Sequence, residues 1–157
     1  MSMQTDNIVQ KTIVVETGID HAFEVFTAGM SSWWPPEHHL ISDIAEIVFE
    51  PRVGGHIFDR SMDGTESHWA RVLAYDPPIR LVFSWNVSLQ WELETDPQKT
   101  SEVEVRFVPE SATRTRVELV HRKLERHGEG WQQMHEAVSG DGGWSVGLQR
   151  FADRVRA

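Results

Sequence analysis

The sequence EPRVGGH at residues 50–56 decides how this chain folds. Its Gly-Gly pair marks a tight turn between two segments that are rich in Val, Ile and Phe. Asp63-Gly64 marks a second turn, and Pro77-Pro78 marks a corner between two further segments of the same kind. Strand-forming segments that alternate with turns at such short intervals are typical of a meandering antiparallel sheet.

The pattern around these turns predicts the remaining elements. Strands are expected over residues 8–16, 44–50, 56–61, 66–75, 79–86, 101–108 and 113–122. Helical segments are expected over residues 21–28, 31–34, 131–138 and 144–156, and Pro35-Pro36 would end the second of them. Asp20 and Asp141 are placed to cap the first and last helices. Residues 87–99 fit either a strand extension or a turn at Asp96-Pro97.

This order predicts an α+β helix-grip fold. A curved antiparallel sheet of about six or seven strands would wrap around a long C-terminal helix, and two short helices would follow the first strand. With 157 residues, the chain is expected to form a single domain over residues 1–157. A curved sheet closed by a helix encloses a cavity, so binding in that cavity is the first hypothesis for function.

The composition excludes several classes of protein. The chain has no Cys, so a disulfide, a thiolate metal site and a Cys nucleophile are excluded. A formal net charge of −9 argues against a nucleic-acid partner, which needs a concentrated basic surface. No apolar run reaches the roughly 18 residues of a membrane span, and the N-terminus lacks the features of a signal peptide. We therefore expect a cytoplasmic protein with no membrane partner.

Spaced features along the whole chain agree in order with one known family. They are residues 19–26, Trp33-Trp34-Pro35-Pro36, residues 49–55, Asp63-Gly64, residues 71–73 up to Pro77-Pro78, residues 81–85 and Gly143-Trp144. In these features the chain resembles the SRPBCC (START-like, birch-pollen-allergen-like) superfamily, and more narrowly proteins related to activators of the heat-shock-protein-90 ATPase. The resemblance implies a cavity between the sheet and the last helix. Members bind apolar or amphipathic molecules, and some catalyse cyclisation or hydrolysis.

Tryptophan is the unusual residue of this composition, with seven Trp against one Tyr. Core packing is expected for most of them, and the others would form the wall of an apolar pocket. Trp33 and Trp34 stand where the short helices would meet the cavity mouth. Trp69, Trp85 and Trp131 are the further candidates for the wall.

Histidines are the main candidates for polar contacts with a ligand. His38 and His39 would lie at the pocket mouth, and His56 is a further candidate. His121 is expected either as a satisfied histidine at a strand end or as a polar anchor in the cavity. Arg71 would pair with Glu50, or bind a carboxylate if it points inward.

No metal or other cofactor is expected. The cluster of Glu37, His38 and His39 with His56 or His68 matches no known metal-binding spacing. An acid–base pair of Glu37 with a histidine remains open.

The sequence therefore predicts binding of a small apolar or amphipathic molecule, without obligatory catalysis. One alternative is an interaction module of the chaperone-activator type, which would need an exposed apolar or charged patch and a chaperone partner. Another is a cyclase or hydrolase that uses His and Glu in the pocket. The sequence is also compatible with a homodimer. It leaves open the ligand, the pathway and the directions of Trp69 and Arg71, because one bulge reverses the facing of a strand.

Overall fold

Seven strands form one antiparallel sheet in the computed structural model, which describes residues 8–156. The order across the sheet is β1-β7-β6-β5-β4-β3-β2. The strands are β1 (Val9–Val15), β2 (Ile44–Phe49), β3 (His56–Ser61), β4 (Glu66–Asp76), β5 (Arg80–Trp85), β6 (Ser101–Ser111) and β7 (Arg114–Arg122). The chain thus meanders from β2 to β7, and β1 pairs with the outer side of β7. This confirms the predicted meander.

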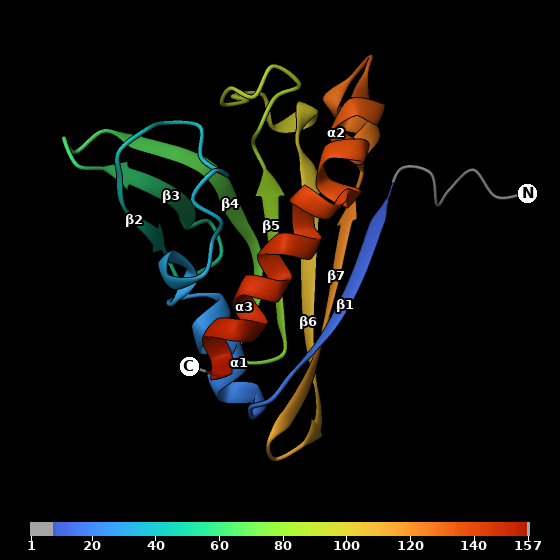
Figure 1. Cartoon of the computed structure of the whole chain (residues 1–157). Helices are drawn as coiled ribbons and strands as arrows, with labels where there is room; N and C mark the ends of the chain where they lie inside the picture. Colours follow the sequence, from blue (N-terminus) through green and yellow to red (C-terminus); the bar gives the residue numbers. More distant parts are fainter. Residues whose placement is uncertain (1–7, 157) are drawn as a thin grey trace, which may run out of the picture.

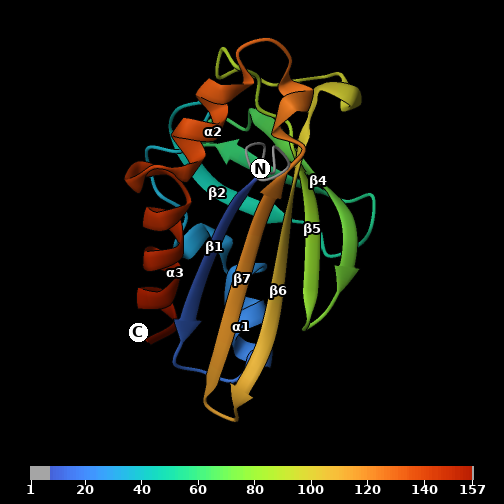
Figure 2. The same ribbon diagram turned by 90° about the vertical axis from the view of Figure 1, so that its right-hand side faces the viewer.

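The helical segments are α1 (Ile19–Phe26), η2 (Met30–Ser32), η3 (Pro97–Lys99), η4 (Leu124–His127), α2 (Trp131–Ser139), η5 (Asp141–Ser145) and α3 (Val146–Arg156). Helices α1 and α3 pack against one face of the sheet. Figure 1 shows α3 crossing the curved sheet from α2 toward α1. Figure 2 shows α3 on one side of the strands. The helix-grip arrangement predicted from the sequence is therefore confirmed. No helix within residues 8–156 is long and apolar enough to span a membrane.

Two predicted helix caps are wrong. Helix α1 begins at Ile19, so Asp20 lies inside its first turn and Gly18 is the N-cap. An acidic residue in the first turn still interacts favourably with the helix dipole. At the other junction, Gly140 rather than Asp141 takes the cap position of η5, and the non-helical backbone of Gly143 puts a kink between η5 and α3. Neither cap position has a side-chain hydrogen bond.

Aromatic packing fills one end of the space between α3 and the sheet. Phe26 lies with its ring centroid 4.9 Å from that of Trp33, 5.2 Å from that of Phe151 and 5.6 Å from that of Phe107. Such tilted and edge-on contacts join α1, the residue that follows η2, α3 and β6 into a dense core. This packing leaves no space for a ligand among Phe26, Trp33, Phe107 and Phe151.

Candidate functional site

A bulge in β4 decides which side chains reach the interior. Ile57 pairs with Ala70 and Phe58 pairs with His68, so Trp69 is an extra residue between two pairs. In a regular strand Trp69 and Arg71 would share a face. The bulge instead leaves Trp69 buried and Arg71 exposed. The direction that the sequence left open is thus inward for Trp69 and outward for Arg71.

A cavity of about 520 Å³ lies between the sheet and the junction of α2 with α3. Its apolar wall includes five tryptophans, namely Trp34, Trp69, Trp85, Trp91 and Trp144. Its polar groups come from the segment after Pro36 and from β3, namely Glu37, His38, His39 and Asp59. Gly142, Gly143 and Gly147 also line the cavity, where η5 leads into α3. The site therefore combines an aromatic wall with one polar side.

Four of the indoles form a closed ring of contacts. Trp34 stacks on Trp69 with centroids 4.9 Å apart, and Trp69 meets Trp85 edge-on at 5.8 Å. Trp85 contacts Trp144 at 5.5 Å, and Trp144 returns to Trp34 at 5.9 Å. Because each ring touches two others, the wall is held in place by its own packing. Trp91 stands apart from this ring in the loop after β5 and is 51% exposed.

The N–H groups of three ring tryptophans are satisfied within the protein. Trp34 donates to the carbonyl oxygen of His38 over 2.8 Å, and Trp69 donates to Asp59 Oδ1 over 3.1 Å. Trp144 donates to His121 Nδ1 over 3.1 Å. Of these four indoles, only Trp85 has a buried Nε1 without a partner among the described residues. The wall can therefore offer a ligand mainly the rings themselves.

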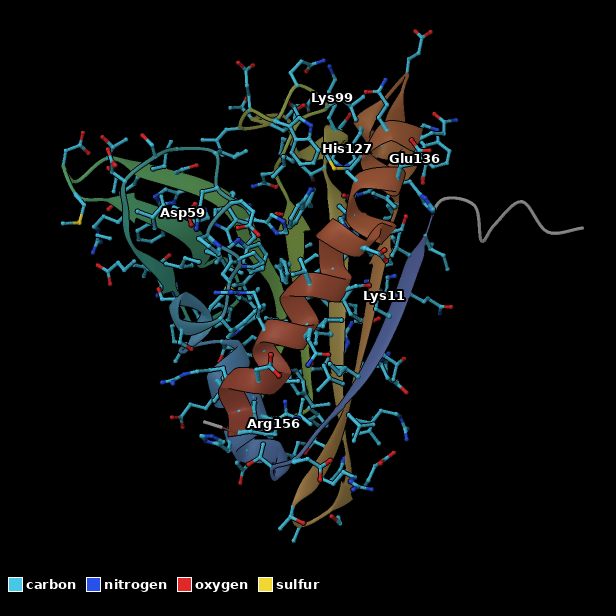
Figure 3. All side chains as sticks on the ribbon, in the orientation of Figure 1. Lys11, Asp59, Lys99, His127, Glu136 and Arg156 are labelled. Carbon is cyan, nitrogen blue, oxygen red and sulfur yellow. The ribbon has the colours of Figure 1, made fainter. Side chains whose placement is uncertain are left out.

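A histidine–carboxylate pair forms the core of the polar side. His39 Nδ1 lies 2.7 Å from Asp59 Oδ2. Asp59 is 1% exposed and its other oxygen accepts the Trp69 N–H, so the buried carboxylate has a partner on each oxygen. Figure 3 shows Asp59 on β3, in the hairpin that β2 and β3 form. The pair links the loop of His39 to the floor of the cavity.

A second polar network lies behind the aromatic wall. His121 Nε2 and His127 Nε2 each lie 2.7 Å from the hydroxyl of Ser101. All three residues are buried. Burial, with a smaller effect of His127 and His135, lowers the pKa of His121 to about 3. Burial also lowers the pKa of His127, against an opposing effect of Glu94. In Figure 3 His127 lies close to α2, away from Asp59.

The structure brings five of the ten candidate residues to the cavity, namely Trp34, His38, His39, Trp69 and Trp85. Trp33 lies in the filled core, where it donates to the carbonyl oxygen of Val25. Trp131 is half-buried against His135.

The remaining three candidates also lie outside the cavity lining. His56 contacts His68 on the neighbouring strand, Arg71 is exposed, and His121 sits behind Trp144. Within residues 8–156 no three His, Asp or Glu side chains are grouped so as to hold a metal ion.

Sequence reasoning missed Asp59 as a site residue. Its position carried a signal, because it alternates with the apolar Ile57 on the inward face of a strand. A carboxylate on such a face has to find partners inside the protein. Trp91 and Trp144 also line the cavity, although the sequence does not predict them as ligand contacts.

The chain is similar to known proteins over nearly its whole length. The model of the family described as "Activator of Hsp90 ATPase homolog 1-like protein" matches residues 16–156. Among curated proteins no sequence matches this chain significantly.

Several solved structures are similar over nearly the whole chain. The anthrahydroquino-gamma-pyrone synthase Txn09, in complex with a ligand, is 42% identical over 94% of this chain and 97% of its own, with a TM-score of 0.66. CalC, a self-sacrificing resistance protein from Micromonospora echinospora, is 27% identical over 96% and 94%, with a TM-score of 0.67. Protein NE0264 from Nitrosomonas europaea is 12% identical over 99% and 98%, also at 0.67, and shares the fold.

Proposed function

This chain belongs to the activator of Hsp90 ATPase homolog 1-like family of the SRPBCC superfamily, and on that premise we propose that it binds a flat aromatic small molecule in the tryptophan-walled cavity. The observation that carries the proposal is the closed ring of Trp34, Trp69, Trp85 and Trp144. Aromatic pairs contribute about 0.5–1.5 kcal/mol beyond the burial of their area. A wall built of rings therefore favours a ligand built of rings over an aliphatic one.

The size and polarity of the cavity support the same proposal. A volume of about 520 Å³ lies within the range of roughly 300–1,000 Å³ that is typical of small-molecule sites. Such sites combine a mainly apolar lining with a few polar groups that orient the ligand. Glu37, His38 and His39 supply those groups on one side only. An amphipathic aromatic molecule fits this cavity if its oxygens point toward these residues and its rings lie against the tryptophans.

The comparisons also favour an aromatic ligand. The synthase that is 42% identical to this chain carries in its name a product with fused aromatic rings. The resistance protein CalC is a second relative of the same fold. The similarity to both relatives extends over nearly the whole of this chain.

The proposal is tested by calorimetric titration with 1,8-dihydroxyanthraquinone as a flat probe and dodecanoate as an aliphatic one. We expect binding of the anthraquinone and at least tenfold weaker binding of dodecanoate. Trp91→Ala should weaken anthraquinone binding by about 3- to 10-fold, the worth of one aromatic contact. Trp91 suits this test because it lines the cavity but is 51% exposed, so its truncation removes little of the core.

Leu93→Ala is the matched control for this titration. Leu93 lies in the same loop, is 41% exposed and does not line the cavity. This variant should bind the anthraquinone as the wild type does. Equal affinity for dodecanoate and anthraquinone, or equal loss in both variants, would contradict the proposal.

An enzyme is the second candidate, and the His39–Asp59 pair at the cavity is the observation that favours it. An interaction module of the chaperone-activator type receives less support. The exposed large apolar side chains are spread over β1, β4 and several turns, for example Val14, Val53 and Met62. Single exposed apolar residues of this kind are normal on protein surfaces.

A further inference from the structure

Three side chains from separate parts of the fold form a directed chain of hydrogen bonds at the cavity. Trp69 on β4 donates to Asp59 on β3, and Asp59 holds His39 in the loop before β2. The two bonds end on different oxygens of the carboxylate, over 3.1 Å and 2.7 Å. An indole N–H can only donate, so Asp59 Oδ1 must accept. The carboxylate is therefore fixed in position before any ligand enters.

These two hydrogen bonds determine the tautomer of His39. The second oxygen of Asp59 is also an acceptor, so Nδ1 of a neutral His39 must carry the proton that it donates. The lone pair of the ring is then on Nε2. Among residues 8–156 the ring makes no hydrogen bond other than the one to Asp59. His39 lines the cavity, and its Nε2 has no hydrogen-bond partner among the described residues.

We propose that His39 is a general base that removes a proton from an acidic C–H or O–H group of an aromatic molecule held in the cavity, with Asp59 as the residue that positions it. The proposal rests on the proposed function, because it needs an aromatic ligand in this cavity. The proton passes to His39 Nε2 and the electron pair of the broken bond stays on the ligand. The imidazolium that forms is stabilised by the Asp59 carboxylate 2.7 Å away.

The surroundings of the pair favour this role over a merely structural one. Asp59 is buried among the tryptophans of the wall, where little water screens its charge. Its electrostatic interaction with His39 is therefore stronger than that of a similar pair at the surface. A comparable pair on this protein lies outside the cavity. There His68 Nε2 lies 2.9 Å from Glu66 Oε1, and both side chains are more than one third exposed. That pair offers a natural control.

The test uses 5-nitrobenzisoxazole, a flat aromatic probe that reacts when a base removes its ring C–H proton. The C–H electron pair completes a nitrile, the N–O bond breaks, and the oxygen leaves as a coloured phenolate. The reaction needs no oxidant or other co-reactant. We expect the wild type to accelerate it with saturation. His39→Gln should lower kcat by at least about 100-fold with little change in KM, the usual range for loss of a general base.

Two further variants separate catalysis from structure. His68→Gln, which removes the exposed pair outside the cavity, should keep the wild-type rate. Asp59→Asn should lower kcat by about tenfold or more while KM stays near that of the wild type. In this variant ¹⁵N spectra should show that the His39 ring no longer holds its proton only on Nδ1. Circular dichroism shows whether each variant is folded.

The outcomes distinguish this proposal from the proposed function. Calorimetry measures whether the probe binds. If it binds but His39→Gln reacts as fast as the wild type, the assignment of His39 as the general base is overturned and the proposed aromatic binding stands. A ¹⁵N spectrum of the wild type with the His39 proton on Nε2 would overturn it as well. If 5-nitrobenzisoxazole does not bind although 1,8-dihydroxyanthraquinone does, the assignment of His39 as a base is overturned, and if neither compound binds, both proposals fail.

Discussion

At the scale of single residues, the indole N–H groups divide the cavity tryptophans into two kinds. Trp69 and Trp144 donate to polar side chains that are themselves buried, whereas Trp85 Nε1 has no partner among the described residues. The first kind fixes a polar network as well as packing against its neighbours. The second contributes only its ring. Substitutions that look alike should therefore have different costs.

Trp69→Phe should destabilise the protein more than Trp85→Phe. Both residues are buried in the ring of indoles and both variants lose one ring of the indole. Only Trp69→Phe also leaves an oxygen of the buried Asp59 carboxylate without its donor, which costs about 1–3 kcal/mol. Urea unfolding followed by circular dichroism measures the difference. Equal losses in the two variants would show that the Trp69 N–H contributes nothing to stability.

At the scale of elements, β4 and the α2–α3 junction set the cavity, and they mark the limit of what the sequence predicts. The turns at Gly54-Gly55 and Asp63-Gly64 predict a strand over residues 56–61, and β3 occupies those residues. The sequence shows no sign of the bulge at Trp69, because an extra residue reverses the side to which later side chains point without changing the composition of the strand. The pairing of Asp59 with His39 depends on a loop that meets a strand 20 residues later. No local pattern encodes that contact.

Two adjacent glycines in η5 test how the α2–α3 junction is built. A Cβ on Gly143 would lie 2.3 Å from the carbonyl oxygen of Val138 and 2.5 Å from that of Ala137. A Cβ on Gly142 would meet no atom within 4 Å. Gly143→Ala must therefore push α2 and α3 apart. This overpacking should lower the free energy of unfolding by about 1–3 kcal/mol or more.

Gly142→Ala is the control for the junction and should change the midpoint of thermal unfolding by only a degree or two. Gly143→Ala should lower that midpoint by several degrees, which differential scanning calorimetry measures. The same variant should weaken binding of the anthraquinone, because Gly143 lines the cavity. A Gly143→Ala protein as stable as the wild type would mean that the junction adapts without cost.

At the scale of the whole molecule, one end of the interior is filled and the other is hollow. Phe26, Phe107 and Phe151 close the end near α1, while the ring of tryptophans surrounds the cavity at the end near α2. The sequence predicted a cavity from the fold and placed Trp34 and Trp85 at it. It did not predict that Trp33 would join the filled end. Adjacent side chains leave the backbone in different directions, and the sequence does not show which of the two points toward Phe26.

The buried histidine network couples the stability of this molecule to pH. Trp144 donates to His121 Nδ1, so the proton of neutral His121 is on Nε2 and points to the Ser101 hydroxyl. Protonation of His121 would set its new N–H against the N–H of Trp144. Burial accordingly lowers the pKa of His121 to about 3 and that of His127 below its ordinary value of 6.5.

We expect the free energy of unfolding to fall as the pH is lowered from 7 to 5. Both folded pKa values lie below the unfolded value, so in this window the unfolded chain binds more protons than the folded one. The stabilisation is complete above about pH 6.5 and is lost as the pH falls toward the folded pKa, by up to about 1.4 kcal/mol per pH unit for each histidine. His121→Phe should be less stable at pH 7 but show a shallower slope, whereas His21→Gln on the exposed side of α1 should keep the full slope. Urea unfolding at pH 5, 6 and 7 measures these slopes. If His121→Phe lost stability with pH as steeply as the wild type, His121 would not be a source of the coupling.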